Sequence, residues 1–147
     1  MFYLNKQDDI LKGLQFDSPS VFIPWDTTEN DVEELFHYHD LRRVTEGYYA
    51  IKNARLFNNL ICNIGLHFSI TLKTIEFFRG DIHNLNESFY DFQMIFEKRF
   101  GKPTRRKQTS DFESFEWNIG NKIKINHYVL DRFGLTEYLS IENVLQL

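Results

Sequence analysis

The chain has 147 residues, of which 15 are Phe, 7 are Tyr and 2 are Trp, while only 7 are Gly and 3 are Pro. This is the size and composition of one ordinary globular domain, which excludes the disordered and low-complexity classes. The formal charge is −4, and outside a basic run at Lys98 to Lys107 only 11 of the 17 basic residues remain against 21 acids. That balance disfavours general nucleic-acid binding, which needs a basic face.

Cysteine usage and the N-terminal residues bear on the compartment. Cys62 is the only cysteine, so a disulfide within the chain is excluded and a reducing compartment is favoured. Residues 1–9 mix charged and apolar side chains, and no stretch of the chain is apolar for long enough to cross a membrane. We therefore expect a soluble, cytoplasmic protein without a membrane partner, folded as a single domain over residues 1–147.

The first predicted elements are a short strand and an acidic helix. Residues 21–25 (Val-Phe-Ile-Pro-Trp) are typical of a strand that is ended by its proline. Thr27 and Thr28 then offer N-caps, and acids follow in the first turn, where the helix dipole favours them. Apolar residues at helical spacing predict a helix from about residue 28 to 39. The segment from Asp26 to Asp40 contains six acids and neither Lys nor Arg.

Three strands are predicted next, at residues 48–56, 60–70 and 72–79. The middle one has the clearest pattern, because its apolar residues alternate with more polar ones: Leu60, Cys62, Ile64, Leu66, Phe68 and Ile70. A period of two places one face of this strand in a core and leaves the other face more polar. Tyr48 and Tyr49 are neighbours on the first strand and must therefore point to opposite sides of it.

A second helix follows, with an apolar stripe formed by Phe89, Phe92, Phe96 and Phe100. Its N-cap is expected at Asn86 or Ser88. It should end at Gly101, which takes the left-handed conformation, and Pro103 prevents continuation. We interpret residues 105–107 as part of an irregular loop. Strands are then predicted at 112–119, 122–130 and 135–141, with turns at Gly120-Asn121 and Phe133-Gly134.

The order of these elements indicates the fold class. It is roughly β-α-βββ-α-βββ, which predicts an α+β domain with about six to seven antiparallel strands and two main helices on one face. Residues 21–79 alone also fit the βαβββ module of the glyoxalase and ring-cleaving dioxygenase group. We reject that reading because the second half lacks a clear leading strand and no matching ligand set can be assigned.

No motif in the sequence identifies a catalytic or metal site. His37 and His39 lie about 200° apart around the predicted helix axis, so they cannot chelate one ion together. Neither HExxH nor a calcium-loop spacing occurs, and the glycine loops of nucleotide sites and the serine elbow of hydrolases are missing. We expect no metal and no cofactor, and we favour a protein that is not an enzyme.

Residues Ser88 to Trp117 carry a recognisable combination of features. An amphipathic helix ends in Phe100-Gly101-Lys102-Pro103, a charged loop follows, and a strand with Phe115-Glu116-Trp117 leads into a hairpin at Gly120. This pattern resembles small cytosolic bacterial α+β proteins, including immunity proteins that accompany contact-dependent or polymorphic toxins. The resemblance implies acidic, aromatic-rich, single-domain proteins that bind another protein.

We interpret the chain as a non-catalytic protein-binding protein, and in particular as an immunity protein that neutralises a cognate toxin. The partner would carry a basic surface, which the acidic segment attracts by electrostatic steering. The candidate partner-binding residues lie on and beside the predicted acidic helix: Trp25, Asp26, Glu29, Asp31, Glu33, Glu34 and His37. We expect reversal of the charges at Glu33 and Glu34 to slow association.

Two alternatives from other classes stay open at this point. One is a small enzyme or ligand-binding domain whose pocket would contain His127, Tyr128, Asp131 and Arg132. The other is an acidic secretion-type chaperone, which would be a homodimer, so that homo-oligomerisation stays open as well. The basic run from Lys98 to Lys107 could bind phosphate, but we favour the interpretation that these residues belong to a helix C-terminus followed by a solvated loop.

Overall fold

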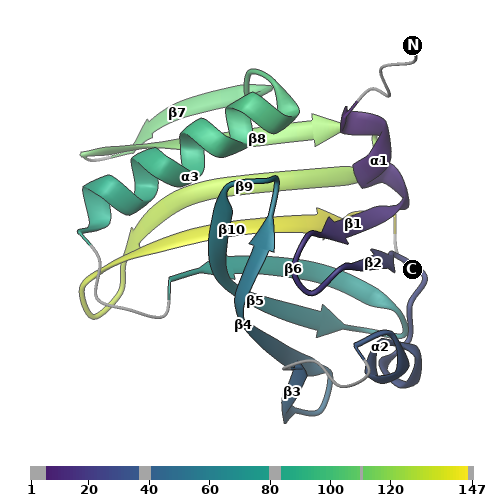
Figure 1. Cartoon of the computed structure of the whole chain (residues 1–147). Coiled ribbons are helices and arrows are strands. Elements are labelled where there is room, and N and C mark those ends of the chain that lie inside the picture. Colours follow the sequence, from purple (N-terminus) through teal and green to yellow (C-terminus); the bar gives the residue numbers. More distant parts are fainter. Residues whose placement is uncertain (1–5, 37–40, 80–83, 110, 146–147) are drawn as a thin grey trace.

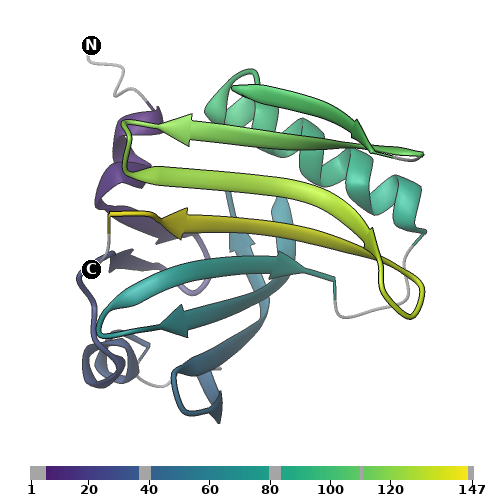
Figure 2. The same cartoon turned by 180° about the vertical axis from the view of Figure 1, so that it is seen from behind.

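An antiparallel sheet of eight strands forms the framework, in the spatial order β3-β4-β5-β6-β10-β9-β8-β7 (Figures 1 and 2). The computed structural model describes residues 6–36, 41–79, 84–109 and 111–145. In chain order the sheet strands are β3 (Leu41–Thr45), β4 (Tyr48–Leu56), β5 (Leu60–Phe68), β6 (Leu72–Phe78), β7 (Arg105–Thr109), β8 (Phe112–Ile119), β9 (Ile123–Asp131) and β10 (Leu135–Asn143). The two halves of the sheet meet where β6 pairs with β10.

Three helices and a two-stranded hairpin lie on one side of this sheet (Figure 1). They are α1 (Lys6–Lys12), the hairpin of β1 (Gly13–Phe16) and β2 (Val21–Pro24), α2 (Glu29–Leu35) and α3 (Leu85–Phe100). The opposite face of the sheet, seen in Figure 2, has no helix over it in the described part of the chain. We call this the open face.

The predicted α+β class and the antiparallel sheet are confirmed, but the predicted number of strands is wrong. The sheet has eight strands rather than six to seven, a further pair forms a second small sheet, and the described residues contain three helices. The clearest correction is β7, which the sequence analysis interpreted as an irregular loop. It has no apolar residue, and it is a strand because Arg105 pairs with Glu116 and Arg106 with Phe115 on β8.

The alternation on β5 places its side chains as predicted, up to the end of the strand. Leu60, Cys62, Ile64 and Leu66 are buried, at 4% exposure or less. Ile70 does not continue this face, because the strand ends at Phe68 and the Ile70 side chain is 76% exposed. The predicted alternation of buried and exposed side chains therefore holds only where β5 is hydrogen-bonded to its neighbouring strands.

The phenylalanine stripe of α3 packs on the sheet as predicted. Phe92, Phe96 and Phe100 are at most 1% exposed, and Phe96 meets the Phe77 ring at 5.2 Å in an edge-on arrangement. The helix begins earlier than predicted, since Asn84 is the N-cap and accepts a hydrogen bond from the Glu87 backbone N–H. At the other end its cap is Gly101, which has a positive φ of 86°.

Candidate functional site

Helix α2 and the turn before it present the acidic surface, which we define as Asp26, Glu29, Asp31, Glu33 and Glu34. Thr28 begins the helix by accepting a hydrogen bond from the Asp31 backbone N–H at 3.3 Å. The apolar side of the helix is buried through Val32, so the carboxylates are left on the outside. The helix ends at Leu35, before the predicted residue 39; His37 lies outside the described residues.

Two of the five carboxylates are occupied by contacts to the sheet. Glu29 accepts a hydrogen bond from the Gly47 backbone N–H at 3.0 Å, and Glu33 accepts one from the Tyr49 hydroxyl at 3.1 Å. Burial, together with the hydrogen bond to Glu33, raises the pKa of the Tyr49 phenol to about 12, so it stays protonated as a donor. These contacts fix α2 on β4 and on the turn that precedes this strand. Asp26, Asp31 and Glu34 are exposed and point away from the fold.

Trp25 is part of the core and not of the exposed acidic surface. Its side chain is 3% exposed, and its indole N–H donates a hydrogen bond to the Ile10 carbonyl at 2.7 Å. The Trp25 backbone N–H donates to the Lys12 carbonyl at 3.1 Å. In this structure the ring joins α1 to the β2–α2 connection and cannot reach a partner.

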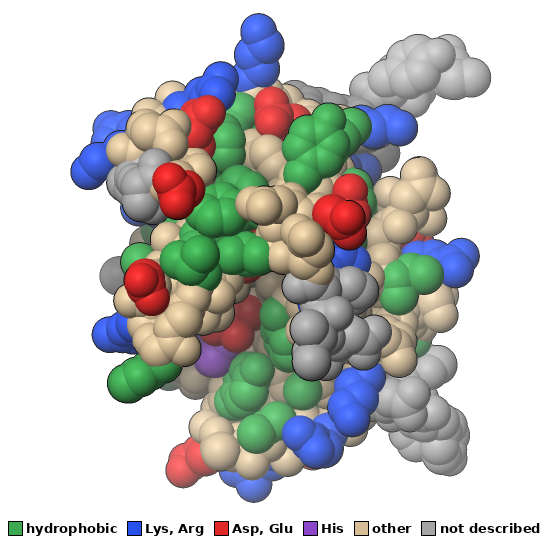
Figure 3. Space-filling model, turned by 90° about the vertical axis from the view of Figure 1, so that its left-hand side faces the viewer, with side chains coloured by type: hydrophobic (Ala, Val, Ile, Leu, Met, Phe, Trp, Pro, Cys, Tyr) green, Lys and Arg blue, Asp and Glu red, His purple; other side chains and the backbone are tan. Residues whose placement is uncertain are grey.

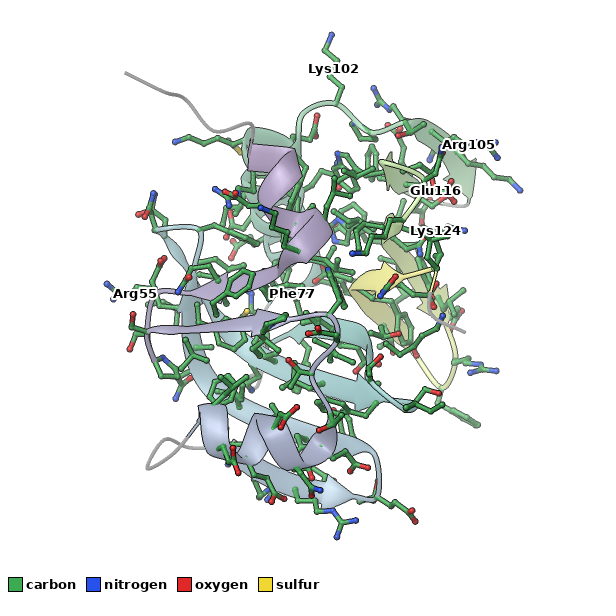
Figure 4. The ribbon with its side chains drawn as sticks, turned by 90° about the vertical axis from the view of Figure 1, so that its right-hand side faces the viewer. Arg55, Phe77, Lys102, Arg105, Glu116 and Lys124 are labelled. Carbon is green, nitrogen blue, oxygen red and sulfur yellow. The ribbon has the colours of Figure 1, made fainter. Side chains whose placement is uncertain are left out.

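The basic residues of the 98–107 run lie at the other end of the molecule (Figure 4), where Lys102 and Arg105 are seen far from α2. Several of them are neutralised locally. Arg106 makes two hydrogen bonds of 2.9 Å to Glu113. Glu116 lies 3.3 Å from Lys124 and 4.0 Å from Arg105, and a hydrogen bond from Asn118 together with these cations lowers the pKa of its carboxyl.

His127 is fully buried and belongs to a polar network between α3 and the sheet. Its Nδ1 lies 2.7 Å from Gln93 Oε1, and its Nε2 lies 2.6 Å from Glu137 Oε2. Glu137 also accepts a hydrogen bond from the Ser88 hydroxyl at 2.6 Å, and the Phe89 ring stacks on the imidazole at 3.9 Å. Ser88 therefore faces the carboxylate and not the imidazole, so this is not the order of groups that activates a serine nucleophile.

The four residues of the predicted His127 pocket are not brought together. Tyr128 points to the opposite face of β9 from His127, because neighbours on a strand alternate. Asp131 and Arg132 are exposed at the end of that strand.

Neither the cysteine nor the metal-ligand residue types provide another site in the described part of the chain. Burial raises the pKa of the Cys62 thiol to about 12, so it is an inert core group. Among the described residues, no three His, Cys, Asp or Glu side chains gather where they could hold a metal ion.

The open face carries two hollows that the sequence analysis did not find. A cavity of about 330 Å³ is lined by side chains of β4, β6, β9 and β10, including Tyr48, Glu76, Tyr128 and Tyr138. A wider one of about 630 Å³ extends from Tyr128 to the basic edge strand β7. Figure 3 views the molecule from the left-hand side of Figure 1 and shows hydrophobic side chains above a hollow that contains acidic and histidine side chains. The sequence contained one signal for this surface: Tyr48 and Tyr49 are neighbours on a strand, so one of the two tyrosines had to lie on the other face of the sheet.

Comparisons with known proteins give one similar structure. No protein-family model matches the chain, and no curated protein matches its sequence. The fold is similar to a crystal structure of a DUF4309 family protein (YjgB) from Bacillus subtilis subsp. subtilis str. 168, at 14% identity and a TM-score of 0.46, covering 95% of this chain and 93% of that one. A similarity of this size does not bear on function. No helix of the described residues is long and apolar enough to span a membrane.

Proposed function

We propose that this protein is a non-catalytic binding protein for a basic partner protein, and in particular an immunity protein that neutralises a cognate toxin. The observation that carries the proposal is on α2. Asp26, Asp31 and Glu34 are exposed, and none of them lies within ion-pair distance of a basic side chain in the described part of the chain. Their negative charge is therefore available to another molecule.

The charge at the C-terminal end of α2 is unfavourable for the helix itself. Its last turn contains acids and no basic residue, although the C-terminal end of a helix dipole favours cations. Like charges one turn apart, such as Asp31 and Glu34, also repel each other. The charge of Glu34 is thus not used by any ion pair of the described residues, whereas it would help to steer a basic partner.

The proposed compartment is the cytoplasm. Cys62 is a buried free thiol, which suits a reducing compartment.

We expect the double variant Asp31→Lys/Glu34→Lys to lose partner binding while it keeps its fold. Lysine near the helix start is unfavourable by a few tenths to about 1 kcal/mol and lysine near its end is favourable by a similar amount, so the two effects on stability cancel approximately. Affinity for the partner should fall by about tenfold or more, mainly through slower association, and its salt dependence should weaken.

The measurement is capture of the partner from a lysate of the source organism, followed by binding kinetics with the purified partner at two salt concentrations. The matched control is Glu87→Lys/Asp91→Lys, which makes the same charge change at two exposed acids of α3. Equal loss in the control would indicate only a general effect of net charge. Wild-type affinity in Asp31→Lys/Glu34→Lys would show that the acidic surface is not the binding surface.

A further inference from the structure

The smaller hollow of the open face, which we call the Glu76 hollow, has an unusual composition. Its cavity of about 330 Å³ is lined by several aromatic residues, among them Tyr48, Phe78, Tyr128 and Tyr138. The charged residues in its lining are Glu76 and Glu137, and neither lysine nor arginine lines it among the described residues. Glu137 is already bonded to Ser88 and His127, so Glu76 is the carboxylate that can meet a ligand, with His67 Nε2 2.8 Å from its Oε1.

Glu76 sits between two aromatic pairs. On one side the Tyr48 ring stacks on His67, with ring centres 4.4 Å apart, and on the other side Tyr128 stacks on Tyr138 at 5.4 Å. Burial first, and then the charge of Glu76, raise the pKa of the Tyr48 phenol. Burial, Tyr138 and Glu76 in that order raise the pKa of Tyr128. The negative charge of Glu76 is thus felt on both sides of the hollow.

In the described part of the chain, the Glu76 carboxylate has one close basic neighbour, which does not form a hydrogen bond to it. His67 Nε2 lies 2.8 Å from Glu76 Oε1, but their orientation is not that of a hydrogen bond, and Nε2 has no hydrogen-bond partner among the described residues. The Glu76 side chain is 43% exposed. Its position depends on Gly65, which faces it on β5, because a Cβ there would lie 2.8 Å from the Tyr48 hydroxyl and 3.2 Å from Glu76 Oε2.

We propose that the Glu76 hollow binds the ammonium or guanidinium end of a lysine or arginine side chain of a basic protein that docks on the open face. The inference rests on the proposed function only in taking the partner to be a basic protein. Aromatic faces attract cations through their quadrupoles, and a carboxylate beside them adds direct charge pairing. The apolar stem of such a side chain would pack on the rings while its head meets Glu76.

The test is an NMR titration of the full chain with a blocked lysine, Nα-acetyl-lysine N-methylamide, at pH 8. We expect the backbone amide signals of Gly65 and Glu76 to shift and to saturate at about 1–10 mM, as is ordinary for an isolated side chain. Blocked norleucine, which has the same stem and no charge, should shift neither. Equal shifts with norleucine, or no shift with lysine, would overturn the proposal.

Variants locate the site. Glu76→Gln should weaken lysine binding at least tenfold, whereas Glu142→Gln, on the same sheet face but outside the lining of the hollow, should leave it unchanged. Gly65→Ala provides an independent test, because its φ is not in the left-handed region and the added methyl group displaces Tyr48 and Glu76. It should stay folded and lose lysine binding. Equal effects of Glu76→Gln and Glu142→Gln would mean diffuse attraction and no site.

The acidic-surface variant separates this inference from the proposed function. Asp31→Lys/Glu34→Lys should bind blocked lysine as the wild type does, because α2 covers the other side of the sheet (Figure 1). If the lysine shifts persist while the Asp31→Lys/Glu34→Lys variant still binds the partner normally, the hollow is a lysine site and the acidic surface is not the partner-binding surface. If partner binding depends on α2 while lysine shifts are missing, only the hollow fails.

Discussion

Trp25→Ala is expected to destabilise the protein by about 3–5 kcal/mol, the usual cost of removing a buried aromatic side chain. The indole ring is 3% exposed, and its N–H bonds to the Ile10 carbonyl. Truncation leaves a cavity and takes away the side-chain donor of that buried carbonyl. Equilibrium unfolding in urea measures the loss, which is a large part of the 5–15 kcal/mol typical of a domain.

The conservative variant Trp25→Phe separates stability from binding. It keeps an aromatic ring in the core and loses only the hydrogen bond and part of the packing, for about 1–2 kcal/mol. Because the chain has 2 Trp, this variant also leaves Trp117 as the single fluorescence probe of unfolding. We expect its affinity for the partner to equal that of the wild type. A large loss of affinity in a stable Trp25→Phe variant would instead show that Trp25 takes part in partner binding.

Trp25 illustrates why the candidate site was harder to predict than the elements. The neighbouring proline and acids were visible in the sequence, but burial of the ring depends on α1, whose Ile10 carbonyl lies fifteen residues earlier. Residue type alone does not separate a tryptophan that anchors an interface from one that fills a core. The Glu76 hollow was missed for a similar reason, since Glu76 meets Ser140 only because β6 pairs with β10 across the sheet.

The elements that were predicted correctly depend on local signals. The Gly120-Asn121 turn has φ values of 59° and 55°, the conformation that glycine and asparagine favour in two-residue hairpins. It joins β8 and β9 close to their predicted bounds. Strand β7 depends on a partner instead, because Arg105–Thr109 has no apolar alternation and pairs with β8. Strand β1 likewise forms by pairing Gly13–Phe16 with β2.

The buried pair His127–Glu137 is the place where a small chemical change should have the most informative effect. Both ring nitrogens of His127 face oxygen atoms, Gln93 Oε1 at 2.7 Å and Glu137 Oε2 at 2.6 Å. Gln93 is held in this orientation by its amide N–H, which donates to Glu97 at 3.0 Å. A proton must therefore lie between His127 Nε2 and Glu137 Oε2, because two acceptors do not approach this closely without one.

Glu137→Ala is expected to cost about 2–4 kcal/mol, while Glu137→Gln should cost less than about 1 kcal/mol at pH 8. Alanine leaves His127 and the Ser88 hydroxyl without their partner and opens a cavity. Glutamine preserves each bond, since its amide N–H donates to Nε2 and its carbonyl accepts from Ser88. Urea unfolding of the two variants provides the comparison, and equal losses would show that shape rather than hydrogen bonding holds the network.

The same pair predicts how stability depends on pH. Burial lowers the pKa of His127, and the hydrogen bond to Glu137 opposes this shift. Below its ordinary pKa of about 6.5 the unfolded histidine takes up a proton that the folded one resists, so stability is complete above that pH and falls as the pH drops. Glu137→Gln removes the opposing contact, so it should lose stability more steeply than the wild type between pH 7 and 5, by up to about 1.4 kcal/mol per pH unit for the one proton involved. A shallower slope in Glu137→Gln than in the wild type would contradict a neutral, buried His127.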